Sequence, residues 1–426
     1  MRRHLCLCLT AAILLGTCLP GAAQKFVPKT IQFKGDPEYS DKELMAAAQL
    51  KLGAVMTSAE MNDHAKLLMD SGIFENLTYK FDGVDLVFSL IPSKVVYPVR
   101  LDNFPLASGP ELDAKLHDKF PLYHGKVPTE GTLLDGVTGA LEDLLAAQGI
   151  KATIIAVPSN DAGQQKASVM SFNIESPPVL VGDIRLDPSS PPLETGAQDI
   201  LSKLSGSPYS AVGSSSQIST YLGNFYRDKG NLEAVVNATP QGAPVITAEA
   251  IRVPFAVSVT PGPTYKLATV KLDPGLLVTQ ADFDHQSNIH PGDIADGQHV
   301  TQNWEYIARQ YHNKGYIKAS VHPTAAYDHS QNTVTFSVAV DPGPAYTMGK
   351  LTIENVSDEL RSAMLAAWKM PAGAVFNEGA IRGFFATHDV NPALERTFAA
   401  VNLSYVMHLN DDVRTVDLTL RLEKKH

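Results

Sequence analysis

Between residues 30 and 92, the spacing of hydrophobic positions changes from that of a strand to that of a helix and then back to that of a strand. Thr30 to Phe33 alternates briefly and ends near a glycine, which predicts a short strand. A helix is expected after Ser40, because Glu43 stands three residues later as in a capping box. Apolar residues on one side of that helix would face a core.

The second helix and the hairpin after it carry clearer signals. A stripe at helical spacing comprises Met61, Ala65, Leu68 and Met69. Gly72 follows where a helix end favours a residue that accepts the left-handed conformation. Two alternating segments, Phe74 to Phe81 and Val84 to Ile91, flank Asp82-Gly83, which is a two-residue hairpin signal. The predicted order is strand, helix, helix, strand, strand.

The same order recurs four more times, with a period of about 80 residues. The glycines that close the second helix in the first four copies are Gly72, Gly149, Gly230 and Gly315. In the fifth copy, Asn391 is the nearest residue that tolerates the same conformation. Two joints are nearly identical, Pro261-Gly262-Pro263-Thr264-Tyr265 and Pro342-Gly343-Pro344-Ala345-Tyr346. Each copy should therefore have a small core of its own.

The first residues have the features of a secretory signal. A basic start precedes an apolar run from Leu5 to Leu15 and the small residues Gly21-Ala22-Ala23, which predicts export and cleavage near Ala23. A lipoprotein signal at Cys18 is the alternative, although the residues around that cysteine fit it poorly. All three cysteines lie in this segment, so the mature chain should have no disulfide. No later segment is long and apolar enough for a direct membrane span.

Composition narrows the function classes. A formal net charge of −10 disfavours binding to nucleic acid or anionic lipid. No motif of a nucleophile elbow, a zinc protease or a phosphate loop occurs. Six histidines gather in the fourth copy, His285, His290, His299, His312, His322 and His329. None has the close pair spacing of zinc ligands, so we expect no enzyme, cofactor or metal site, with a zinc-dependent enzyme built on these histidines as a remote alternative.

The repeated unit, its Gly-Pro-x-Tyr joints and the signal together resemble the polypeptide-transport-associated (POTRA) domain family of outer-membrane β-barrel assembly factors and two-partner secretion transporters. The resemblance is strongest in Thr30 to Pro92 and Tyr265 to Tyr346. It implies an α+β fold, a tandem array of five strand-helix-helix-strand-strand (POTRA-like) domains, each a three-stranded mixed sheet with two helices on one face. After a signal peptide over 1–23, the expected domains are 24–93, 94–177, 178–262, 263–343 and 344–426.

In that family, the strand after the second helix lies at an open sheet edge and accepts an extended segment of another protein. The physical reason is general, because an edge presents unpaired N–H and C=O groups that template pairing. The protein-binding residues predicted on these strands are Asn76, Thr78, Lys80, Lys151, Thr153, Ile155, Glu233, Val235, Asn237, Lys318, Ser320, His322, Asn402, Ser404 and Val406.

The resulting prediction is a non-enzymatic periplasmic scaffold or chaperone-like adaptor, associated with the outer membrane, that binds protein clients by edge-strand addition during outer-membrane protein assembly or secretion. A structural spacer that docks a separately encoded outer-membrane barrel is the alternative. Barrel-bearing relatives continue after their last repeat, whereas the sequence stops at Lys424-Lys425-His426. We therefore expect either a stand-alone string of domains or the soluble part of a longer protein.

Overall fold

The computed structural model describes residues 25–106, 108–160, 166–386 and 401–424. The predicted signal peptide and Asn391 lie outside the described residues. Within the described part of the chain, no helix has both the length and the apolar composition to cross a membrane.

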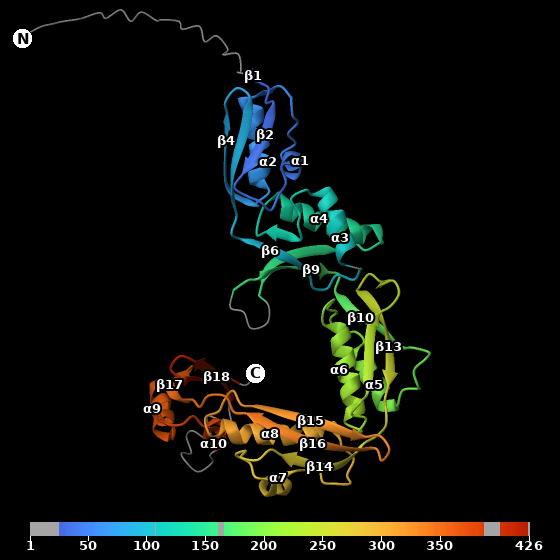
Figure 1. Cartoon of the computed structure of the whole chain (residues 1–426), viewed down its shortest axis with the longest axis vertical. Coiled ribbons are helices and arrows are strands. Elements are labelled where there is room, and N and C mark those ends of the chain that lie inside the picture. The colour runs from blue at the N-terminus through green and yellow to red at the C-terminus, as the bar shows by residue number, and fades with distance from the viewer. Residues whose placement is uncertain (1–24, 107, 161–165, 387–400, 425–426) are drawn as a thin grey trace, which may run out of the picture. The chain divides into compact units, whose positions relative to one another are not determined.

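The chain forms two compact units that divide within the third copy of the repeat. The N-terminal unit comprises residues 1–183, 205–214 and 240–255, and the C-terminal unit comprises 184–204, 215–239 and 256–426. Both units consist of helices and strands, as Figure 1 shows, and both contain sheets that join parallel and antiparallel pairs. The coarse prediction of an α+β fold is therefore confirmed.

The first sheet of the N-terminal unit has three strands. In spatial order they are β2, β5 and β4, over Thr30–Lys34, Asp85–Pro92 and Phe74–Phe81. Strand β5 is parallel to β2 and antiparallel to β4. The connecting helices are α1 (Asp41–Ala47) and α2 (Ser58–Asp70). A short pair that the sequence did not predict joins β1 (Lys25–Phe26) to β3 (Met56–Thr57).

The capping box and the hairpin turn of this copy form as predicted. Ser40 and Glu43 form a reciprocal capping box at α1. The predicted hairpin turns at Asp82, whose Oδ1 accepts from the backbone N–H groups of Val84 and Asp85 at 2.9 and 2.8 Å. These bonds satisfy turn donors that would otherwise lack a partner, and they fix where β5 begins.

The second sheet of this unit has four strands. In spatial order they are β7, β6, β9 and β8, over Lys126–Pro128, Val96–Leu101, Val169–Ser176 and Thr153–Ser159. Strand β9 is parallel to β6 and antiparallel to β8. Helices α3 and α4 span Pro110–Lys119 and Thr132–Ala147. The short strand β7 was not predicted, and it closes the edge of the sheet beside β6.

The sheet of the third copy has the order β10, β13, β11, with β12 also paired to β13. These strands span Val179–Leu186, Ile251–Thr260, Val235–Pro240 and Val245–Ile246. Helices α5 and α6 of this copy span Thr195–Leu204 and Ser214–Arg227.

The C-terminal unit contains two further three-stranded sheets. In the fourth copy, β14, β16 and β15 span Lys266–Leu272, Thr333–Asp341 and Ser320–Asp328, with helices α7 (Gln280–Gln286) and α8 (Gly297–His312). In the fifth copy, β17, β19 and β18 span Thr347–Glu354, Thr415–Lys424 and Val401–Asn410, with helices α9 (Asp358–Ala367) and α10 (Glu378–Ala386). Both sheets join a parallel and an antiparallel pair.

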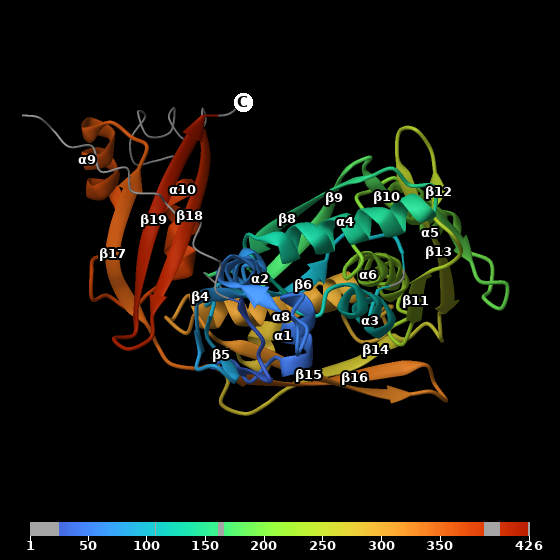
Figure 2. The same cartoon turned by 90° about the horizontal axis from the view of Figure 1, so that it is seen from above.

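The fourth and fifth copies have separate hydrophobic cores. In the fourth copy, Val300 and Ile307 of α8 pack with Val334 and Val338 of β16. Figure 2 shows α8 running along the sheet that holds β15 and β16. The core of the fifth copy is a different cluster, centred on β19. Apolar burial therefore stabilises each of these two copies from within.

The joint at Pro261–Tyr265 lies inside the C-terminal unit and is closed by backbone hydrogen bonds. The Tyr265 N–H donates to the carbonyl of Gly230 at 2.9 Å, and the Tyr265 carbonyl accepts from the Ala295 N–H at 2.9 Å. The Tyr265 side chain is fully buried, and its hydroxyl donates to Glu233 Oε2.

The joint at Pro342–Tyr346 repeats this construction. The Tyr346 N–H donates to the Gly315 carbonyl at 2.8 Å, and the Tyr346 carbonyl accepts from the Phe376 N–H at 3.0 Å. The Tyr346 hydroxyl donates to Asp411 Oδ1 at 2.6 Å, and Lys318 Nζ donates to the same oxygen at 2.7 Å. Each motif therefore positions a buried tyrosine that ties two copies together.

Candidate protein-binding edges

In each of the five larger sheets, the strand after the second helix is the last strand in the sheet order and pairs with one neighbour. These strands are β4, β8, β11, β15 and β18. A strand in this position has N–H and C=O groups that point away from the sheet and can pair with another extended segment. The sheet order thus puts this strand where the resemblance implied.

In the second, fourth and fifth copies, the opposite edge of the sheet pairs with another segment of the chain. In the fourth copy, Leu267 of β14 donates to the carbonyl of Asp293 and accepts from the N–H of Gly292, both at 2.8 Å. In the fifth copy, Met348 of β17 donates to the carbonyl of Ala374 at 2.8 Å. In the second copy, strand β7 covers β6. The segment before the second helix therefore occupies one edge of the sheet in these copies, and the strand after that helix forms the other edge.

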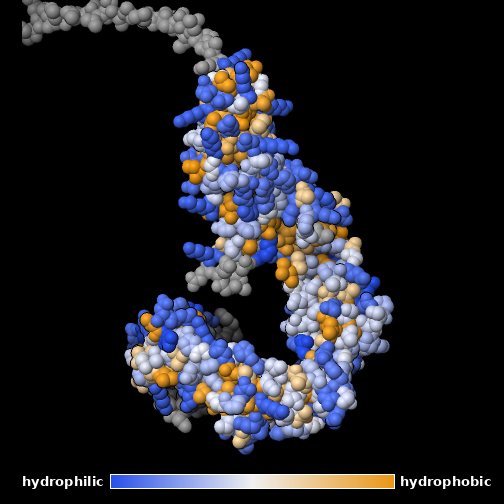
Figure 3. Space-filling view, viewed as in Figure 1, coloured by the Kyte–Doolittle hydropathy of each residue, from blue (hydrophilic) through white to orange (hydrophobic). Residues whose placement is uncertain are grey.

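Eleven of the predicted residues are exposed on these edge strands. They are Asn76, Thr78, Lys80, Thr153, Ile155, Val235, Asn237, Ser320, His322, Ser404 and Val406. The apolar members are Ile155, Val235 and Val406, with exposed fractions of 39, 53 and 48%. On the face drawn in Figure 3, apolar residues form small patches among polar ones. Asn402 lies in β18, and its side chain is outside the described residues.

Three predicted residues lie outside the edge strands, contrary to the prediction. Lys151, Glu233 and Lys318 each stand two residues before the strand begins. The physical reason is the turn after the second helix, which in the fourth copy is closed by the Ala319 N–H donating to the Tyr316 carbonyl at 3.0 Å. Glu233 and Lys318 belong instead to the two joints, where they contact Tyr265 or Asp411.

The edge strands differ in how many backbone donors they can offer. Pro158 interrupts β8 and Pro323 interrupts β15, and a proline has no N–H to donate. Prolines on edge strands are one way in which proteins discourage unwanted pairing. Strands β4 and β18 contain no proline. No proline removes a donor from these two edges, and on β4 the Leu77 N–H donates to Asn76 Oδ1 of the same strand at 2.8 Å.

Helix side chains occupy single donors on two other edges. The Ile154 N–H of β8 donates to Glu142 Oε1 of α4 at 2.9 Å. The Ala238 N–H of β11 donates to Ser219 Oγ of α6 at 3.0 Å. An incoming strand would have to displace these bonds to pair along the full length, so β8 and β11 are less accessible templates.

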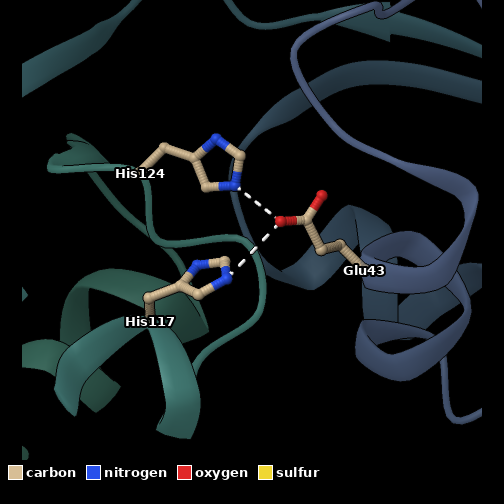
Figure 4. A group of neighbouring side chains, drawn as sticks. All are labelled: Glu43, His117 and His124. Carbon is tan, nitrogen blue, oxygen red and sulfur yellow. Dashed lines mark hydrogen bonds and ion pairs between the residues drawn. The ribbon is translucent and has the colours of Figure 1, made fainter. Parts of the chain in front are cut away.

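The histidines of the fourth copy do not converge on one point. His299 contacts Asp296 at 2.7 Å, and His312 contacts Glu378 at 2.9 Å, so each has its own acidic partner. Among the described residues, the group of three metal-type donors that does converge is Glu43, His117 and His124, shown in Figure 4. Sequence reasoning missed this group because Glu43 and His124 lie 81 positions apart in different copies.

Comparison with known proteins agrees with the resemblance. Residues 265–343 match the POTRA family model, described as a surface antigen variable number repeat. The chain is also 20% identical over 432 residues to the outer membrane protein assembly factor BamA of Buchnera aphidicola, an alignment that covers 97% of this chain and 67% of that protein. The match of the fourth copy confirms the predicted resemblance to POTRA domains.

Solved structures of the same kind are also similar. The POTRA3-5 segment of Haemophilus influenzae BamA aligns with 14% identity and a TM-score of 0.45, covering 58% of this chain and 96% of that one. The POTRA1-3 segment of Omp85 from Anabaena aligns with 15% identity and a TM-score of 0.22, covering 59% of this chain and 97% of that one.

Proposed function

We propose that this protein is a periplasmic, non-enzymatic scaffold made of five tandem POTRA-like domains, which holds protein clients by adding their extended segments to its sheet edges. Its place is in outer-membrane protein assembly or secretion. The observation that carries the proposal is an edge strand, in each of five sheets, that pairs on one side only. The similarity to an outer membrane protein assembly factor along 97% of the chain supports the same process.

The edges that suit this role best are β4 and β18, because proline interrupts neither strand. Exposed residues on β4 are Asn76, Thr78 and Lys80, and the strand also buries Phe74 in the core of the first copy. A suitable client is an unfolded segment with alternating apolar and polar residues, as strands of outer-membrane proteins have. Main-chain bonds would supply affinity and alternate side chains selectivity.

Proline substitution at the edge tests this proposal. The Asp82 N–H donates to the Asp85 carbonyl at the hairpin turn, so donors alternate back along β4 and the Tyr79 N–H points away from β5. Tyr79→Pro should weaken capture of an unfolded outer-membrane protein segment by about five-fold or more, since each lost hydrogen bond is worth about 1 kcal/mol. Tyr79→Ala is the matched control, because it removes the same side chain and keeps the N–H. Fluorescence anisotropy of a labelled segment measures affinity, and circular dichroism verifies that both variants fold.

The proposal predicts a difference between the proline and alanine variants at this edge. If prolines placed on all five edge strands leave binding of the segment unchanged while the chain stays folded, strand addition is not the mode of capture.

A spacer that docks a separately encoded outer-membrane barrel is the second candidate function. The joints favour it, because Tyr346, Lys318 and Asp411 link the fourth and fifth copies through hydrogen bonds at 2.6 and 2.7 Å. A spacer needs such links and no client site. Full-length chain that fails to bind any extended segment, yet binds a purified barrel, would favour the spacer over the scaffold.

A further inference from the structure

Two histidines and a glutamate meet where the first copy contacts the second, inside the N-terminal unit (Figure 4). Glu43 lies on α1, His117 lies on α3, and His124 lies in the segment that follows α3. Glu43 Oε1 is 3.0 Å from His124 Nε2 and 3.5 Å from His117 Nε2. All three donor atoms lie within 4.8 Å of one another.

The glutamate is oriented by the helix cap. Its other oxygen, Oε2, accepts from the Ser40 N–H and from the Ser40 hydroxyl, each at 2.7 Å. These bonds fix the carboxylate, and Oε1 is directed at the two imidazole rings (Figure 4).

The histidine His117 is oriented by a backbone carbonyl. Its Nδ1 lies 2.9 Å from the Tyr123 carbonyl oxygen, which can only accept. Nδ1 therefore carries the hydrogen, and in the neutral ring Nε2 presents a lone pair toward Glu43 Oε1. This arrangement, in which the second ring nitrogen donates to a carbonyl, is the one that metal-binding histidines adopt.

The histidine His124 is held by ring packing. Its ring centre lies 4.8 Å from that of Tyr39 and 5.2 Å from that of His117. The side chains of Glu43, His124 and His117 are 22, 26 and 41% exposed, so the group is shielded on one side and open to water on the other. A bound ion could thus take one or more water molecules as its remaining ligands.

We propose that Glu43, His117 and His124 form a binding site for a divalent transition metal ion, with Zn²⁺ as the best match, that fastens the first copy to the second. With bonds of about 2.0–2.1 Å at tetrahedral angles, neighbouring ligand atoms lie about 3.3 Å apart, which fits the two measured separations from Glu43 Oε1. Two imidazole nitrogens and one carboxylate oxygen suit zinc better than calcium or magnesium. The lone pair of His117 and the carboxylate, both acceptors, would both be satisfied by the ion.

A structural role follows from where the ligands come from. Glu43 belongs to the first copy, whereas both histidines belong to the second, so an ion bound by all three joins the two copies by coordinate bonds. Lys126 Nζ also donates to Glu38 Oε1 at 2.8 Å across the same joint. The ion would add to this ion pair and stiffen the joint.

Titration of the full mature chain, untagged, with Zn²⁺ in a calorimeter tests the site. One equivalent should bind, and Co²⁺ in its place should give the visible absorption of a low-symmetry site. His117→Ala/His124→Ala should lower the Zn²⁺ affinity by at least about 10–100-fold. A loss of that size is typical when a metal ligand loses only its hydrogen-bond partner, and this variant loses two ligands. His290→Ala/His322→Ala, which removes two exposed histidines of the fourth copy, is the matched control and should bind as the wild type does.

A second variant separates ligation from folding. Glu43→Gln keeps a residue that can complete the capping box, so α1 should form while the charged ligand is lost. This variant should also bind Zn²⁺ more weakly, and Zn²⁺ should raise its melting temperature less than that of the wild type. The absence of stoichiometric Zn²⁺ binding, or equal affinity in the wild type and the double histidine variant, would overturn the proposal.

Discussion

At the scale of the residue, the joints depend on glycines at which a side chain would collide with backbone. Gly315 has φ of +91°, and a Cβ atom there would lie 2.8 Å from the Tyr346 carbonyl oxygen. The position therefore needs glycine both for its conformation and for the close approach of the next copy. Gly373 has φ of +83°, but a Cβ there would meet no atom within 4 Å.

Gly315→Ala should destabilise the C-terminal copies more than Gly373→Ala does. The backbone conformation alone should cost about 1 kcal/mol in both variants. Relief of the clash at Gly315 should add about 1–3 kcal/mol. Urea unfolding followed by tryptophan fluorescence measures the difference, because Trp304 and Trp368, the only two tryptophans, lie in the fourth and fifth copies. Equal destabilisation would contradict the close contact at this joint.

The stability of the joint at Pro342–Tyr346 should depend on pH through Asp411. Hydrogen bonds from Lys318 and then Tyr346 lower the pKa of this carboxyl. Its folded pKa thus lies below the unfolded value of about 3.9, so its stabilising effect is complete at neutral pH. The effect should decline below about pH 4 and vanish as the pH falls through the folded pKa.

Thermal unfolding of the wild type and Asp411→Asn between pH 7 and pH 2 measures this effect. The two melting temperatures should differ at neutral pH and converge in acid. Because Asp411 is exposed, the difference should also shrink at high salt. A difference that stays constant over the whole pH range would mean that Asp411 does not titrate against Lys318 and Tyr346.

At the scale of the element, local signals predicted most helices and strands. Ser40, Glu43 and the Asp82-Gly83 turn fix their own neighbourhoods through bonds to residues at most three positions away. Such signals can be read without knowledge of the fold. Strand β17 is less regular, since its register against β19 shifts between Met348 and Leu351.

The features that the sequence did not reveal depend on distant contacts. Strand β7 has three residues, too few for an alternation to be recognised, and it exists because it pairs with β6. In the fourth and fifth copies, the cover over the opposite sheet edge is made of irregular segments. The predicted strands began too early, at Lys151, Glu233 and Lys318. The reason is that the residues of the turn after each helix cannot be told from strand residues by their polarity.

At the scale of the whole molecule, the proposed function would use several sheet edges of one chain as places for an extended partner. In each of the five larger sheets, the strand after the second helix pairs on one side only, and prolines or helix side chains restrict some of these edges. A client would then pair with β4 of the first copy or β18 of the fifth copy in preference to the other edges. Capture at several weak edges of one chain would raise the overall affinity for a long unfolded client.

Hydrogen–deuterium exchange of the full chain, with and without an unfolded outer-membrane protein segment, tests the central claim most directly. Strand addition predicts that the segment slows amide exchange in residues 74–81 and 401–410, because their outward N–H groups gain partners. Slower exchange confined to the helices or the joints, with both edge strands unchanged in the presence of bound segment, would contradict the account.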